Sequence, residues 1–193
     1  MIAAGGGRTV ITFHVGQQEA QSIVDEIAVD FGPGRCTSLQ YNAASPAGPQ
    51  LATLSDALTQ VYYFATPQIF RQTSELYSPV RFAQFQTIYL DGFYELCKAV
   101  RGTMEHPVSV FYPSSVAIEK RPREMTEYSM VKAAGEQLAA DINKFWKGIT
   151  VHTHRLPRLL TDQTATIMPI EGENPIDVML PIIRKMRRIT PLH

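Results

Sequence analysis

The stretch Phe111–Ala139, FYPSSVAIEKRPREMTEYSMVKAAGEQLA, decides the fold of this chain. It starts within the apolar run Val108–Tyr112, which predicts a buried strand, and the Pro-Ser-Ser sequence at 113–115 ends that strand in a turn. The polar run EKRPRE at 119–124 predicts a loop, and residues 127–145 have the periodicity of a helix with alanine-rich packing. A strand that leads through a loop into such a helix is one unit of a parallel sheet covered by helices.

Short apolar runs alternate with longer helical segments over the whole chain. Strands are predicted at 8–15, 36–41, 61–65, 108–112 and 149–154, and helices at 17–31, 50–58, 79–100, 127–145 and 175–189. This order predicts an α/β protein with a doubly wound parallel sheet. A chain of 193 residues, 45% of them hydrophobic, can bury one continuous core, so residues 1–193 are expected to form a single domain.

The composition favours a small-molecule partner. Eighteen basic residues balance eighteen acidic ones, so no overall charge attracts the chain to nucleic acid or to an anionic membrane. No apolar run approaches the roughly 18 residues of a membrane span, and glycines stand where a secretory signal has its apolar core. A cytoplasmic protein is therefore expected. Cys36 and Cys97 are far apart and have no metal-ligand spacing, so both are expected to be buried thiols.

Three residues of the opening stretch form a candidate acid/base site. Tyr128 and Lys132 are four apart in a predicted helix and project from one face, where an ammonium would lower the pKa of the phenol. Such a pair on an exposed helix also arises often by chance. Ser115, however, stands thirteen positions before Tyr128, at the carboxyl end of a predicted strand, where open parallel sheets bind their ligands.

This combination of strand, Ser-Ser turn, loop, Y-x-x-x-K and small-residue helix resembles the short-chain dehydrogenase/reductase family. The segment TVITFHVGQQEAQSIVDEI at 9–27 is similar to the second strand and helix of β-ketoacyl reductase-like members, and IYLDGFYELCKAV at 88–100 is similar to their long fourth helix. The resemblance implies a Rossmann-like fold. It also implies that Tyr128 is the general acid/base, that Lys132 lowers its pKa and binds the nicotinamide ribose, and that Ser115 orients the carbonyl or hydroxyl.

The same resemblance implies further cofactor-binding residues. Pro157 and Thr161 lie where the family's Pro-Gly-to-Thr segment touches the nicotinamide amide, and Ala65 lies in the family's Asn-Ala-Gly turn. His14 ends the strand at 8–15, where no Asp or Glu is present to hold an adenine ribose, and this favours NADP over NAD. The family's catalytic asparagine aligns with Tyr89, which leaves a changed proton relay or a lost activity open.

The family's first strand and glycine-rich phosphate loop have no counterpart in the sequence. Gly5–Gly7 precedes a strand, whereas a phosphate loop follows one, so a turn is expected there. In the family's strand order the missing strand lies at the centre of the sheet, between the strands at 8–15 and 61–65. The gap would be closed by a longer polypeptide, by direct pairing of those two strands, or by a second copy in a homo-oligomer. The 193 residues alone are expected to bind NAD(P)H weakly or not at all.

The function predicted first is an NAD(P)-dependent oxidoreductase that interconverts a carbonyl and an alcohol, with an acyl thioester among the possible substrates. The alternatives are a non-catalytic fragment or structural half-domain of a larger enzyme, or an epimerase or dehydratase of the same superfamily. His152 and His154 share one face of a strand but have no third ligand, so packing or edge exposure is favoured over a metal. The basic cluster at 184–188 suits a helix C-terminus, with an acidic carrier or a phosphate as the alternative.

Overall fold

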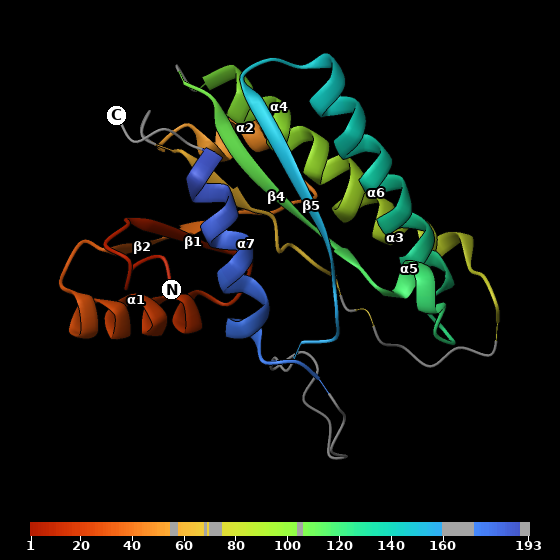
Figure 1. Ribbon diagram of the computed structural model, residues 1–193, viewed down its shortest axis with the longest axis horizontal. Coiled ribbons are helices and arrows are strands. Elements are labelled where there is room, and N and C mark those ends of the chain that lie inside the picture. Colours follow the sequence, from red (N-terminus) through yellow and green to blue (C-terminus); the bar gives the residue numbers. More distant parts are fainter. Residues whose placement is uncertain (55–57, 68, 70–74, 104–105, 160–171, 190–193) are drawn as a thin grey trace.

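Helices and strands alternate along the chain, as the apolar pattern predicts (Figure 1). The computed structural model describes residues 1–193 except 55–57, 68, 70–74, 104–105, 160–171 and 190–193. The elements, in chain order, are β1 (Thr9–Phe13), α1 (Gln17–Phe31), β2 (Cys36–Gln40), α2 (Ala47–Leu51), β3 (Gln60–Tyr62), α3 (Pro79–Gln86), η1 (Thr87–Gly92), α4 (Phe93–Thr103), β4 (Val108–Ser115), α5 (Ala117–Lys120), α6 (Thr126–Phe145), β5 (Ile149–Leu156) and α7 (Pro175–Ile189). The predicted α/β class is confirmed.

The strands form two separate parallel sheets in the described part of the chain. One pairs β1 with β2, and the other has the order β3-β4-β5. β1 and β3 do not pair with each other, so the alternative in which these two strands close the gap directly is wrong for the described residues. Packing fixes the register of each strand against its own neighbour, with Thr9 opposite Cys36 and Gln60 opposite Ser109. Closure by a longer polypeptide or by a second copy stays a prediction.

Helices cover both faces of the larger sheet (Figure 1). Val110 and Tyr112 of β4 belong to the main core, which packs the sheet against α4 and α6. Phe111, between them, packs on the other face against Met179 and Met186 of α7. β4 is therefore buried on both faces, which explains its continuous apolar sequence.

The long helix predicted at 79–100 is interrupted at its centre. A π-helical turn, η1, separates α3 from α4, and the Tyr63 hydroxyl donates to the backbone oxygen of Ile88 in this turn at 2.5 Å. Gly92 ends the turn where a side chain could not fit, because a Cβ atom there would lie 2.3 Å from the backbone oxygen of Ala43. The long helix expected at 79–100 is therefore present, and only the π-helical turn within it was not predicted, because such a turn inserts an extra residue that the apolar period does not show.

Other boundaries differ by a few residues. The helix expected at 50–58 overlaps α2 only at Gln50 and Leu51, because α2 begins directly after Pro46 and ends at Leu51. The strand expected at 61–65 ends at Tyr62, and the loop at 119–124 starts in the short helix α5. Gly5–Gly7 lies in a turn before β1, as expected. Both cysteines are buried and free, which confirms that prediction. Among the helices of the described residues, none combines the length and apolarity that crossing a membrane requires.

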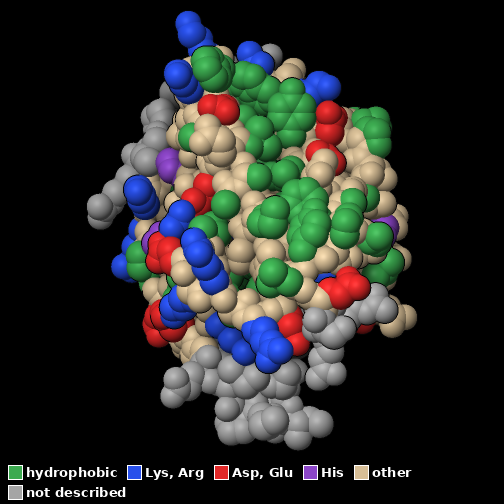
Figure 2. All heavy atoms as spheres, turned by 90° about the vertical axis from the view of Figure 1, so that its right-hand side faces the viewer, with side chains coloured by type: hydrophobic (Ala, Val, Ile, Leu, Met, Phe, Trp, Pro, Cys, Tyr) green, Lys and Arg blue, Asp and Glu red, His purple; other side chains and the backbone are tan. Residues whose placement is uncertain are grey.

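Apolar side chains gather on the outer face of the helical layer. Figure 2 shows this face, to which α3, α4 and α6 contribute. The large exposed hydrophobic residues of these three helices include Val80, Tyr94, Met130 and Phe145. Homo-oligomerisation stays a prediction.

Candidate active site

α6 directs Tyr128 and Lys132 toward the end of β4. The two side chains lie one helical turn apart and are almost fully buried, at 8% and 3% exposure. Lys132 Nζ donates to the backbone oxygen of Pro113 at 2.6 Å, and the Tyr128 side chain is hydrogen-bonded to that of Ser115. The structure therefore brings Ser115, Tyr128 and Lys132 together, while their catalytic roles stay predictions.

Three tyrosine rings surround the amino group of Lys132. The centroids of the Tyr89, Tyr112 and Tyr128 rings lie 3.9, 4.9 and 5.7 Å from Nζ. Ring faces attract a cation, which offsets part of the cost of removing it from water. Burial nevertheless lowers the pKa of Lys132 to about 7, so amine and ammonium are both populated at neutral pH.

The pKa of Tyr128 is shifted opposite to the sequence-based expectation. Burial raises it, and the hydrogen bond with Ser115 lowers it by less. The lysine was expected to lower it, but Lys132 Nζ is bonded to the backbone oxygen of Pro113 and its charged form is itself disfavoured. At neutral pH the Tyr128 hydroxyl therefore keeps its proton.

Tyr89 of η1 forms an aromatic wall of this site. Its ring meets that of Tyr128 edge to face, with centroids 5.6 Å apart. Its hydroxyl lies 2.5 Å from Oγ1 of Thr66, which follows β3. Tyr89 therefore places a buried ring over Lys132 and a hydroxyl against Thr66, four residues after the end of β3.

A charged network, which the sequence did not indicate, holds the last residues of β4. The Pro-Ser-Ser sequence at 113–115 was expected to form a turn, but it continues the strand and pairs with β5. The Ser114 hydroxyl donates to Oε1 of Glu136, two turns beyond Tyr128 on α6, at 2.5 Å. Arg155 of β5 donates to both carboxylate oxygens of Glu136, at 2.8 and 2.7 Å, and also pairs with Glu119. The hydrogen bond from Arg155 is the main cause that holds the pKa of Glu136 below its usual value. Glu136 could have been found from its i+8 spacing to Tyr128, but Arg155 has no local signal.

The predicted cofactor-binding residues lie in different places. Ala65 and Pro157 follow β3 and β5, at the same edge of the sheet as Ser115, and both are half-buried. His14 is exposed and follows β1, in the other sheet. Thr161 lies outside the described residues. The structure therefore brings Ala65 and Pro157 to the edge with Ser115, and it places His14 apart from them.

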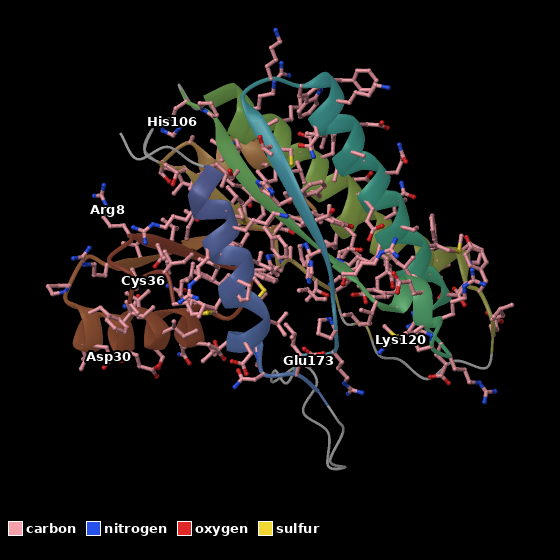
Figure 3. The ribbon with its side chains drawn as sticks, viewed as in Figure 1. Arg8, Asp30, Cys36, His106, Lys120 and Glu173 are labelled. Carbon is pink, nitrogen blue, oxygen red and sulfur yellow. The ribbon has the colours of Figure 1, made fainter. Side chains whose placement is uncertain are left out.

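Two aromatic residues that follow β3 lie near this edge. Tyr63 is buried against Phe93, with ring centroids 5.5 Å apart, whereas Phe64 packs on Phe111 and is 50% exposed. Figure 3 shows Lys120 at the end of α5, close to the end of β4. Among the described residues, no group of three or more His, Cys, Asp and Glu could hold a metal ion.

No protein-family model and no curated protein matches this chain. Solved structures do match it. A short-chain dehydrogenase from Sphingobium yanoikuyae in complex with NADPH superposes with a TM-score of 0.78 at 14% identity, over 96% of this chain and 77% of that one. A short chain dehydrogenase from Burkholderia cenocepacia in complex with NADP gives 0.68 at 20% identity, over 95% and 73%.

A third match has a different activity in its name. It is the FolM alternative dihydrofolate reductase 1 from Brucella canis complexed with NADP, with a TM-score of 0.74 at 13% identity, over 97% of this chain and 78% of that one. In all three pairs nearly the whole of this chain superposes on about three quarters of the other. The described part of the chain therefore has the fold of the short-chain dehydrogenases and reductases, without the whole of their length.

Proposed function

We propose that this chain is the catalytic part of an NADP-dependent oxidoreductase that interconverts a carbonyl and an alcohol. The observation that carries the proposal is the contact of β4 with α6. Three side chains on consecutive turns of α6 form hydrogen bonds with three consecutive residues at the end of β4. Lys132 bonds to Pro113, Glu136 to Ser114 and Tyr128 to Ser115. Two hydroxyl groups and an amino group thereby converge at the carboxyl edge of a parallel sheet, where ligands of such sheets bind.

The protonation states favour reduction of a carbonyl. The Ser115 hydroxyl would hold the substrate oxygen, and the Tyr128 hydroxyl would donate a proton to it. Because burial raises the pKa of Tyr128, this proton is present at neutral pH. In the oxidation direction Tyr128 must accept a proton, and a charged Lys132 beside it would then stabilise the phenolate.

The residues present fit one end of a nicotinamide cofactor. Lys132 and Tyr128 could hold the nicotinamide ribose, and Ala65 and Pro157 lie at the same edge. When bound, the cofactor supplies or accepts the hydride. In the described residues, no strand lies between β1 and β3, and the only glycine triplet precedes β1. These residues therefore form no glycine-rich loop that could bind the pyrophosphate end of the cofactor. NADP or NADPH is bound in the three related structures, and the exposed His14 without a neighbouring acid suits its 2′-phosphate better than the ribose of NAD.

The proposal is tested by incubating the chain with millimolar NADPH and a panel of aldehydes, ketones and β-ketoacyl thioesters. For at least one class of compound, we expect one NADPH to be consumed for each alcohol formed. The Ser115→Ala variant should lose most of this rate, because the substrate oxygen loses a hydrogen-bond donor. Products that are epimerised or dehydrated without net NADPH loss would contradict a reductase, and so would an unchanged rate in Ser115→Ala.

A further inference from the structure

The end of β4 that carries Ser115 has few backbone contacts with the sheet. β3 ends opposite Phe111, so in the described part of the chain residues 112–115 of β4 pair with β5 alone. Pro113, within this stretch, has no N–H group to donate to a neighbouring strand. The position of Ser115 therefore depends on side-chain contacts as well as on the strand pairing.

An ion pair between β5 and α6 provides such a contact. Arg155 lies opposite Ser114 in the register of β4 and β5, and it donates to both carboxylate oxygens of Glu136, at 2.8 and 2.7 Å. These hydrogen bonds hold the pKa of Glu136 below its usual value, so at neutral pH its carboxylate is ionised and only accepts hydrogen bonds. The Ser114 hydroxyl donates to this fixed carboxylate at 2.5 Å, which ties β4 to α6.

The same guanidinium group also reaches the segment that follows Ser115. Its Nη1 atom donates to Glu119 of α5, a short helix that packs on α6 (Figure 1). Ala117, the first residue of α5, donates its backbone N–H to Ser115 Oγ at 3.1 Å. Because Glu119 is exposed, this second contact contributes less than the pair with Glu136. Arg155 is nevertheless connected to both residues that flank the position of Ser115 in the chain, through Ser114 before it and through α5 after it.

We propose that Glu136 is a positioning residue of the acid/base site. Held by Arg155, it fixes the end of β4 through Ser114. The Ser115 hydroxyl thereby stays in contact with Tyr128. This inference rests on the proposed reductase function, in which both hydroxyl groups bind the same substrate oxygen. A displacement of about 1 Å between reacting groups can lower a rate about 100-fold, so a residue that touches neither substrate nor cofactor can still limit turnover.

The contact between Ser115 and Tyr128 can be followed without turnover. The NMR signal of the Tyr128 Cζ atom is recorded at neutral pH in the full chain with isotope-labelled tyrosine, and it is identified by its absence from Tyr128→Phe. We expect Ser115→Ala to shift this signal, because the hydrogen bond to the phenol is lost. Ser114→Ala should shift it in the same direction. Ser109→Ala is the matched control, a second buried serine near the opposite end of β4, and it should leave the signal in place.

A double variant shows whether the effect of Ser114 passes through Ser115. In a chain that already carries Ser115→Ala, adding Ser114→Ala should cause no further shift of the Tyr128 signal, because the contact that it supports is already gone. An equal shift in both backgrounds, or no shift by Ser114→Ala in the original chain, would overturn the proposal. If the signals behave as expected but the chain reduces none of the panel compounds, the proposed function fails and the positioning stands.

Reduction rates give the matching kinetic test. Glu136→Gln keeps an oxygen that accepts from Ser114, but the amide cannot accept both hydrogen bonds from Arg155. We expect Ser114→Ala and Glu136→Gln to lower kcat about 10- to 100-fold while the KM for NADPH stays nearly unchanged. Arg155→Lys should also lower kcat, because an ammonium group lacks the planar fork that binds both carboxylate oxygens. A kcat of Ser114→Ala equal to that of Ser109→Ala, or a loss confined to the KM for NADPH, would overturn the proposal.

Discussion

Replacing Lys132 by methionine should stabilise the folded chain at neutral pH. The side chains are similar in length, but only the lysine must lose a proton or bury a charge on folding. Its pKa falls from 10.5 to about 7, a difference of 3.5 units, and each unit corresponds to about 1.36 kcal/mol. The full shift would cost nearly 5 kcal/mol, but about half of the folded lysine is still protonated at pH 7, so the cost at this pH is about 4 kcal/mol. Methionine removes this cost but leaves the backbone oxygen of Pro113 without its donor, which costs about 1 to 3 kcal/mol.

The pH dependence gives a sharper test than the value at one pH. Because the folded pKa of Lys132 lies below the unfolded one, the unfolded chain binds the extra proton, and the cost grows as the pH falls from 10.5 to 7. At pH 9.5 the cost is only about 1 kcal/mol, so the advantage of Lys132→Met should shrink by about 3 kcal/mol between pH 7 and pH 9.5. Higher pH is avoided, because tyrosines whose pKa is raised in the fold, such as Tyr89 and Tyr112, then destabilise it.

Urea denaturation at pH 7, 8 and 9.5 measures this difference. The free energy of unfolding is compared for the original chain, Lys132→Met and the control Lys144→Met, which changes an exposed lysine of the same helix. We expect Lys132→Met to be about 1 to 3 kcal/mol more stable at pH 7 and no more stable at pH 9.5. A difference that does not vary with pH, or a loss of stability at pH 7, would refute the reasoning.

Three further predictions concern packing, charge and cofactor. Gly135→Ala should destabilise the fold by about 1 to 3 kcal/mol, because its Cβ would lie 2.0 Å from the Tyr112 hydroxyl. Urea denaturation measures this loss and should show that adding Tyr112→Phe restores part of it. A Gly135→Ala variant as stable as the original chain would contradict the close contact. Arg155→Met should move acid unfolding to higher pH. The ion pair with Arg155 lowers the pKa of Glu136, and it stabilises the fold until the pH falls through that lowered pKa. An unchanged pH midpoint of acid unfolding, followed by circular dichroism, would argue against a stabilising pair. The isolated chain should bind NADPH more weakly than micromolar in calorimetry, and micromolar or tighter binding would contradict the missing phosphate site.

Local spacing in the sequence predicted much of the site. Tyr128 and Lys132 are one helical turn apart, and Ser115 ends the preceding apolar strand, so spacing along the chain is enough to group the three residues. The sequence left open whether the strands at 8–15 and 61–65 pair directly, and in the described residues β1 and β3 do not.

Long-range packing decided what the sequence could not predict. The direction in which the pKa of Tyr128 is shifted depends on burial. The environment of the Lys132 amino group depends on Tyr89 and Tyr112, which belong to other elements. Arg155 reaches Glu136 from a different strand, so no spacing along the chain indicated it. The π-helical turn η1 depends on packing against the loop that contains Ala43 and does not alter the apolar pattern enough to be seen.

The Tyr128→Phe variant tests the proposed acid/base site most directly. It removes only the transferable proton, and Tyr94→Phe is the control, because Tyr94 is a partly exposed tyrosine on α4. Reduction rates are measured at millimolar NADPH with the best substrate of the panel, and NADPH affinity is measured for each variant. We predict that Tyr128→Phe loses turnover while its NADPH affinity stays within a few-fold of the original, and that Tyr94→Phe keeps both. Turnover by Tyr128→Phe equal to that of the original chain would contradict the account.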